Sequence, residues 1–359
     1  MDPIQTAIAA ITLPHTQRSL GSEKALVSAE VRGNDLHVVL RFAYPVAHLQ
    51  AALTEAIAAA TGHATANIQL HIDSNIAVHK VQQGVNTIAG VKNIIAVASG
   101  KGGVGKSTTT TNLAIALSKM GARVGVLDAD IYGPSQPLMF GVSGQKPQSI
   151  DGKTMQPLEG YGVQLMSIGF LLENPDQAMI WRGPMAVQAL EQMLRQTNWH
   201  GLDYLIIDLP PGTGDIQLTM SQRIPVTGAV IVTTPQDIAL ADARKGIQMF
   251  EKVSVPILGL VENMAMHVCS QCGHVEHIFG HDGGKALAQD KGLHFLGALP
   301  LSLQIREQAD SGKPTVVAAP DSEVAAIYKK LARDVAVQVA LASTEQAAKA
   351  PTISIHRKK

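Results

Sequence analysis

Cysteine is scarce in this 359-residue chain, which contains Cys269, Cys272 and no others. A pair separated by two residues cannot cross-link distant segments, so the sequence excludes a small secreted domain held together by disulfides. The stretch Met1 to Ala10 has no basic start and no long apolar core, so a secretory signal is not expected. We expect a cytoplasmic protein, in which such a cysteine pair is typical of a metal site or a redox site.

Net charge and long apolar runs are missing as well. The 29 Lys and Arg residues balance the 29 Asp and Glu residues, so nothing in the charge points to a nucleic-acid partner. No apolar run reaches the ~18–20 residues that span a bilayer, and a membrane partner is not expected. Hydrophobic residues make up 46% of the chain, which is enough for a large core and argues against disorder. The length indicates about two domains.

Glycine, in contrast, is concentrated at 100–107, where the sequence fits the P-loop pattern. Glycines allow successive backbone N–H groups to point at phosphate oxygens, and the positive end of the following helix faces the same anion. A buried strand over 93–98 and a helix over 108–120 provide the expected flanks. The residues predicted to bind nucleotide here are Gly100, Lys101, Gly102, Gly103, Val104, Gly105, Lys106, Ser107 and Thr108.

Strand and helix patterns alternate after the P-loop, as they do in a parallel sheet covered on both faces. We therefore predict an α/β fold, a P-loop NTPase with a mostly parallel, doubly wound sheet, preceded by a small α/β domain. The predicted boundaries are 1–80 for the small domain, 81–92 for a linker, 93–343 for the ATPase domain and 344–359 for a flexible tail. Strands at 25–32, 36–42 and 67–72 and a helix at 46–60 are expected in the small domain.

Polar residues follow several predicted strands, at the sheet edge where ligands of open α/β sheets collect. Asp208 closes an apolar strand, which is the place of a carboxylate that holds Mg²⁺ in P-loop enzymes; a helix cap or a turn is the alternative. Lys106 is expected to reach the β- and γ-phosphates, and the Ser107 hydroxyl to bind Mg²⁺. Asp128 and Asp130 end another strand. Their carboxylates are suited to supporting Mg²⁺ or to orienting the attacking water, and the alternative is a pair of turn aspartates.

Asn263 also follows a buried strand. Its amide is suited to reading the adenine edge of a nucleotide, and the alternative is an ordinary turn asparagine. Asp237 is expected to cap a helix that runs to Phe250.

The second lysine of the P-loop, Lys101, resembles the signature lysine of the deviant Walker A ATPases, which include Min-type and Par-type proteins and nitrogenase iron protein. Further motifs make the resemblance closer, and together with the cysteine pair the chain is similar over about 90–340 to Mrp-type (ApbC-type) iron–sulfur cluster carrier ATPases. These motifs are Leu-Asp-Ala-Asp-Ile-Tyr-Gly-Pro-Ser at 127–135, Trp-Arg-Gly-Pro-Met at 181–185, Asp-Leu-Pro-Pro-Gly-Thr-Gly-Asp at 208–215, Thr-Thr-Pro-Gln at 233–236 and Glu-Asn-Met at 262–264.

The resemblance implies ATP, Mg²⁺ and a [4Fe–4S] cluster as ligands, and a homodimer that receives the cluster from scaffold proteins and passes it to apo iron–sulfur proteins. It also implies that Lys101 acts on the partner's nucleotide, that Asp130 orients the attacking water and that Asp128 belongs to the metal shell. The small domain resembles the one that precedes many such carriers, although it has Tyr44 and Pro45 and no cysteine, so that a docking or regulatory role is expected for it.

The cysteines fit this implication, because a cubane cluster takes four thiolates and a symmetric dimer supplies two pairs. Zinc is the rival ligand, since a Cys₂His₂ site can be drawn from the cysteines and His267, His274, His277 and His281. A redox disulfide is less favoured, because Gly273 predicts a loop rather than a helix start.

Two other functional classes share the P-loop. A Min- or Par-type switch, with zinc as a structural metal, would need a membrane-binding tail or a basic DNA-binding face, and the sequence predicts neither. A reductase like nitrogenase iron protein holds its cluster with cysteines that lie far apart in sequence.

Overall fold

The structure is a computed structural model, and it describes residues 2–78, 86–171 and 183–349. Trp181 and Arg182, residues 81–85 of the predicted linker and the last ten residues of the predicted tail lie outside these ranges. In the described part of the chain, no helix is long and apolar enough to cross a membrane.

Within these ranges, one large sheet contains eight strands in the order β15-β12-β11-β6-β10-β7-β9-β8. All neighbouring pairs are parallel except β8 and β9. The central strands are buried along their whole length, as expected for a parallel sheet covered on both faces. The predicted α/β class and the mostly parallel sheet are therefore confirmed. The strands are β6 (Val91–Ala98), β7 (Val124–Asp128), β8 (Leu158–Gly160), β9 (Val163–Ser167), β10 (Leu202–Asp208), β11 (Gly228–Thr233), β12 (Ile257–Glu262) and β15 (Phe295–Ala298).

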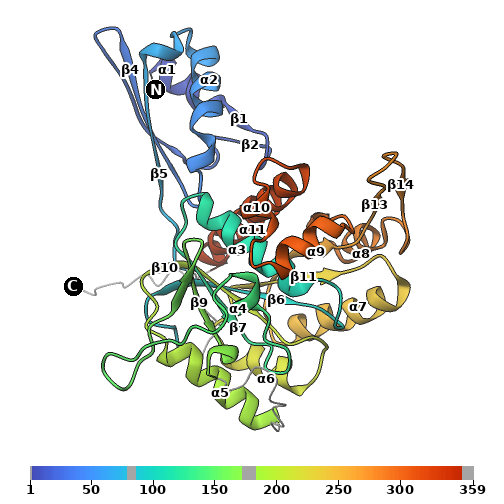
Figure 1. The fold of residues 1–359 in the computed structure, drawn as a ribbon. Helices are drawn as coiled ribbons and strands as arrows, with labels where there is room; N and C mark the ends of the chain where they lie inside the picture. The colour runs from blue at the N-terminus through green and yellow to red at the C-terminus, as the bar shows by residue number, and fades with distance from the viewer. Residues whose placement is uncertain (1, 79–85, 172–182, 350–359) are drawn as a thin grey trace, which may run out of the picture.

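Helices cover both faces of this sheet (Figure 1). On one face lies α3 (Lys106–Lys119), which packs against β6, β7 and β10, and α11 (Glu323–Lys349) packs along α3. On the other face lie α5 (Gly183–Gln196), α6 (Asp215–Arg223) and α7 (Asp237–Lys252). The shorter helices are α4 (Gln136–Met139), α8 (Gly283–Lys291), α9 (Leu303–Asp310) and α10 (Thr315–Ala318).

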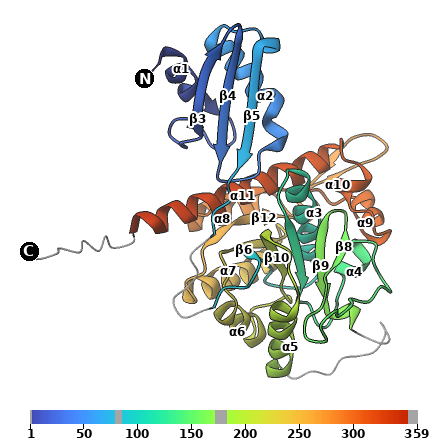
Figure 2. The ribbon, with the colours of Figure 1, turned by 90° about the vertical axis from the view of Figure 1, so that its left-hand side faces the viewer.

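The N-terminal residues form a separate three-stranded sheet that stands above α11 (Figure 2). Strands β3 and β4 are an antiparallel hairpin, and α2 connects β4 to the parallel strand β5. The predicted strands of this unit are confirmed within two residues. The helix predicted at 46–60 is confirmed, although its α-helical part begins at Gln50, after a 3₁₀ turn at Ala47–Leu49. Elements α1, β1 and β2 were not expected. The elements are α1 (Pro3–Ala10), β1 (Thr12–Leu13), β2 (Arg18–Ser19), β3 (Leu26–Arg32), β4 (Asp35–Phe42), α2 (Gln50–Thr61) and β5 (Ile68–Ser74). The division at residue 80 stays a prediction.

Two local features differ from expectation. Helix α11 continues to Lys349, so that 344–349 of the predicted tail are helical, and the boundary of the tail stays a prediction. Good helix formers such as Glu345, Gln346 and Ala347 extend the helix beyond its apolar pattern. Asp237 is the first residue of α7 and Gln236 occupies the N-cap position, where Asp237 contributes acidic charge to the first turn instead of a cap.

Candidate functional site

The predicted P-loop connects the end of β6 to the start of α3 and surrounds a cavity of about 240 Å³. Gly105 has φ +81, in the left-handed region that favours glycine, and a Cβ there would collide with the amide of Asn263. A Cβ on Gly100 would collide with the backbone of α7 at Asp242. The cavity is lined by Ser99, Lys101, Gly102, Gly103, Gly105, Lys106, Ser107, Thr108, Asp130, Ser135, Met139 and Pro211. Most of the predicted phosphate-binding residues thus share one cavity.

The sheet brings Asp208 to Lys106. Strand β10 lies between β6 and β7, and Asp208 pairs in register with Val97 on one side and Asp128 on the other. The Lys106 Nζ atom is 2.6 Å from Asp208 Oδ1 and 3.9 Å from Asp130 Oδ2. The Lys106 side chain is 6% exposed and that of Asp208 is completely buried, which makes this a buried ion pair.

Three further residues hold these carboxylates, and sequence reasoning missed all of them. Thr110 Oγ1 donates to Asp208 Oδ1 at 3.0 Å, and Gln136 Nε2 donates to Asp208 Oδ2 at 2.9 Å. Ser167 Oγ donates to Asp128 Oδ2 at 3.0 Å. Thr110 follows Lys106 by four residues on the same helix face, and Ser167 ends the strand next to β7. Both residues could therefore have been predicted at the site from their positions in the sequence. Gln136 carried none, because its contacts depend on the tertiary fold.

Asp128 and Asp130 differ in their surroundings. Asp128 is fully buried, and its oxygens accept hydrogen bonds from the backbone N–H groups of Asp130 and Gln136 as well as from Ser167. Burial, reinforced by the charge of Asp208, raises the pKa of Asp128. Asp130 lines the cavity, and burial raises its pKa although the charge of Lys106 opposes this shift. Of the two, Asp130 is the carboxylate that reaches the cavity.

Lys101 and Asn263 lie on the β11–β12 side of the loop. Lys101 Nζ is 3.4 Å from Oε1, the side-chain amide oxygen of Gln236, which lies in the segment that follows β11. Asn263 Nδ2 donates to the Val104 carbonyl oxygen at 2.8 Å and thereby ties the end of β12 to the P-loop. The predicted contacts of Lys101 with a partner's nucleotide and of Asn263 with adenine stay predictions.

The cysteines lie at the turn of a hairpin that projects from the body of the molecule (Figure 1). Strand β13 (His267–Val268) pairs with β14 (Val275–Glu276), and the Cys269 N–H donates to the His274 carbonyl oxygen at 2.9 Å. Hydrogen bonds from the backbone N–H groups of Cys272 and Gln271 lower the pKa of Cys269, which favours the thiolate that binds metal. Cys272 is exposed and Cys269 is partly exposed, so solvent reaches both residues.

The histidines near the hairpin do not complete a zinc site. His267 Nδ1 lies 3.2 Å from the Leu301 carbonyl oxygen, and His277 Nδ1 lies 2.9 Å from that of Ala265. In the segments that the structure describes, no three His, Cys, Asp or Glu side chains are grouped so that they could hold a metal ion. The Cys₂His₂ alternative is therefore not assembled within one described chain.

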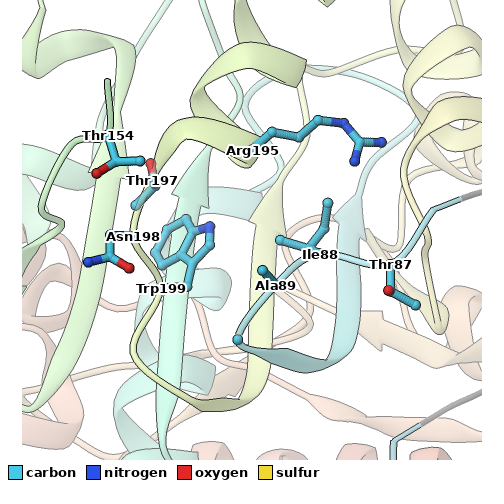
Figure 3. A pocket seen from close by; sticks show the side chains of 9 residues that line it. Thr87, Ile88, Ala89, Thr154, Arg195, Thr197, Asn198 and Trp199 are labelled. Atoms are coloured by element: carbon cyan, nitrogen blue, oxygen red, sulfur yellow. The ribbon is translucent and has the colours of Figure 1, made fainter. Parts of the chain in front are cut away.

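A larger cavity, of about 450 Å³, lies away from the P-loop (Figure 3). It adjoins Gly90, just before β6, and Trp199, just before β10, and thus lies at the opposite ends of the strands. Thr197, Asn198 and Trp199 line one side of it and Thr87 and Ile88 the other. The Trp199 indole N–H already donates to the Leu194 carbonyl oxygen. None of the predicted site residues lines this cavity.

Comparison with known proteins agrees with the P-loop geometry. Residues 90–336 match the family model "ParA: NUBPL iron-transfer P-loop NTPase". The chain is 59% identical to an iron-sulfur cluster carrier protein of Pseudomonas fragi over 74% of this chain and 92% of that protein. It is 49% identical to the protein of the same name from Haemophilus influenzae, over 94% and 91% of the two chains. A nucleotide-binding protein of Archaeoglobus fulgidus, solved with ADP, is 39% identical with a TM-score of 0.56, over 62% of this chain and 88% of that chain.

Proposed function

The chain belongs to the family of NUBPL-type iron-transfer P-loop NTPases, and from this premise we propose that it is an ATP-hydrolysing carrier of [4Fe–4S] clusters. In this proposal two protomers hold one cluster between them, accept it from scaffold proteins and transfer it to apo iron–sulfur proteins. The observation that carries the proposal is that the short segment after β12 connects the P-loop to the cysteine hairpin. Asn263, which follows β12, is bonded to the P-loop, and the cysteine hairpin begins four residues later at His267.

The P-loop residues would supply the ATP chemistry. The backbone N–H groups of the loop and Lys106 would bind the phosphates, and the Ser107 hydroxyl would bind Mg²⁺. Mg²⁺, when bound, neutralises charge on the β- and γ-phosphates. The donors suit this ion, because Ser107 and Asp130 offer oxygen atoms in the same cavity. Asp208 would join the ion's shell once Lys106 turns to the phosphates, and Asp128 would support that shell from behind.

Hydrolysis would depend on positioning. Asp130 would orient the attacking water, because it is the carboxylate that lines the cavity. Lys101 would donate its charge to the nucleotide of the second protomer and stabilise the transition state there.

The cluster would be the cargo of the hairpin. Cys269 and Cys272 of two protomers would provide the four thiolates that a cubane cluster takes. The lowered pKa of Cys269 and the exposure of Cys272 support this role, since thiolates are the ligands and a second protomer needs access.

Anaerobic reconstitution with iron and sulfide tests the proposal. Wild-type protein should bind about two irons per chain and elute as a dimer. Changing both Cys269 and Cys272 to Ala should abolish iron binding and transfer to an apo-protein and leave ATP binding intact. Ser270→Ala, in the same turn, serves as the matched control and should retain iron. One tightly held zinc per chain, with no iron after reconstitution, would refute the carrier function and favour a Min- or Par-type switch with a structural metal.

A further inference from the structure

Gln136, the first residue of α4, connects helix α3 with the two carboxylates Asp128 and Asp208 beside the P-loop cavity. It is completely buried, although it is a polar residue in a loop-to-helix junction. Its carboxamide Oε1 accepts from Thr111 Oγ1 at 2.7 Å, and Nε2 donates to the Ser107 carbonyl oxygen at 3.2 Å and to Asp208 Oδ2 at 2.9 Å. Its backbone N–H donates to Asp128 Oδ2 at 3.1 Å.

These contacts leave the carboxamide a single orientation. The two acceptors, the Ser107 carbonyl oxygen and Asp208 Oδ2, require the NH₂ group on their side, and the Thr111 hydroxyl then donates to the amide oxygen on the other side. A flipped amide would place its oxygen against two other oxygens in a buried place, which is unfavourable. The Asp208 carboxylate is therefore held at Oδ2 by a donor that cannot turn away.

The other oxygen of Asp208 faces Lys106. Asp208 Oδ1 accepts from Lys106 Nζ and from Thr110 Oγ1. A P-loop lysine contacts the β- and γ-phosphates of a bound nucleotide, so Lys106 must leave Asp208 when ATP enters. Oδ1 would then keep only Thr110 as a partner and would be open to Mg²⁺ or its water, while Oδ2 would remain hydrogen-bonded to Gln136.

We propose that Gln136 is the positioning residue that keeps the Asp208 carboxylate aimed at the Mg²⁺–nucleotide site while Lys106 changes partner. The inference rests on the proposed nucleotide binding and deepens it by naming how the metal-side carboxylate is oriented. The inference predicts a change in how strongly Mg²⁺ enhances nucleotide binding, and little change in the affinity for nucleotide when Mg²⁺ is absent.

Nucleotide binding with and without Mg²⁺ tests the inference without reliance on turnover. Fluorescent ADP is titrated at increasing Mg²⁺ and again with a chelator present. Gln136→Met keeps the side-chain length and removes the amide. The Mg²⁺ concentration needed for half-maximal enhancement of nucleotide binding should rise about tenfold, because a hydrogen bond to a charged group is lost. Binding in chelator should change less than about twofold. Gln217→Met, at a buried glutamine of α6 outside the cavity lining, is the matched control and should leave both measurements unchanged.

A double-mutant cycle with Asp208→Asn tests whether Gln136 acts through Asp208. Once the carboxylate is replaced, adding Gln136→Met should cause little further loss, and additive losses would overturn the inference. If Gln136→Met does not fold, Thr111→Val provides the second variant, because it removes the hydroxyl that donates to the Gln136 amide oxygen and should shift the Mg²⁺ requirement in the same direction.

The outcomes separate the inference from the proposed function. Wild-type protein with no Mg²⁺-dependent nucleotide binding would overturn the proposed ATP site and this inference together. Wild-type dependence on Mg²⁺ with an unchanged Mg²⁺ requirement in folded Gln136→Met or Thr111→Val would overturn the inference alone. Equal weakening with Mg²⁺ and with chelator would also overturn it, because it would show a purely structural role.

Discussion

Replacing Lys106 with methionine should destabilise the protein even when no nucleotide is present. The substitution keeps the bulk of the side chain but removes the cation that lies 2.6 Å from the buried carboxylate of Asp208. Removing one partner of a buried ion pair costs about 3–5 kcal/mol in the free energy of unfolding. Thr110 and Gln136 still donate to Asp208, so we expect the lower end, about 3 kcal/mol. For a domain of this size the melting temperature should fall by about 6–12 °C.

Lys101→Met is the matched control, because it removes the same charge from the same loop. The Lys101 amine contacts the neutral Gln236 side chain at 3.4 Å and leaves no buried carboxylate behind. Its melting temperature should stay within about 2 °C of the wild type, as for a substitution away from buried charges. Thermal unfolding is followed by circular dichroism in buffer that contains a chelator and no nucleotide.

The pH dependence of the stability deficit, meaning the loss of stability of Lys106→Met relative to wild type, provides a second measurement. Burial and the charge of Asp208 raise the pKa of Asp128, and the charge of Lys106 lowers it, so that the substitution should raise this pKa further. A carboxyl group whose pKa is raised on folding binds protons more tightly in the folded state, and stability then falls as the pH rises. The deficit should therefore be smaller at about pH 5.5 than at about pH 8. A deficit equal to that of Lys101→Met, or one that widens toward acid pH, would refute the reasoning.

Three further results are expected. Lys101→Ala should bind nucleotide yet release phosphate at least about tenfold more slowly, and mixing it with Lys106→Ala should restore part of the rate; unchanged turnover would leave Lys101 without a catalytic role. Gly105→Ala should lose nucleotide affinity in calorimetry, because the positive φ and the contact with Asn263 exclude a Cβ, and wild-type affinity would contradict the loop geometry. Burial lowers the pKa of His15 to about 4, so acid should destabilise the N-terminal unit as the pH falls from about 6.5 toward about 4; His15→Gln should flatten this slope in a melting series.

Local patterns in the sequence were sufficient to predict the P-loop and the strand and helix that flank it. A buried strand, a glycine-rich turn and a helix are each defined by neighbouring residues, so the P-loop at 100–107 and its flanks were predictable. The rule that polar residues at the ends of parallel strands share one edge also predicted that Asp128, Asp130 and Asp208 would meet. The cysteine hairpin was predicted only as a loop, because its two-residue strands are too short to show alternation.

Only the tertiary structure decided which atoms face one another at that edge. The order of the strands places β10 between β6 and β7, and its register sets Asp208 beside Asp128 and within reach of Lys106. Asp128 and Asp130 look alike in sequence, yet one is enclosed by donors and the other lines the cavity. Gln136 lies 72 residues from Asp208 in the chain, and its contact with Asp208 depends on the packing of α4 against α3 and β9. Periodicity records which face of its own element a residue occupies, whereas a hydrogen bond between distant segments requires strand order, register and side-chain orientation to agree within a few tenths of an ångström.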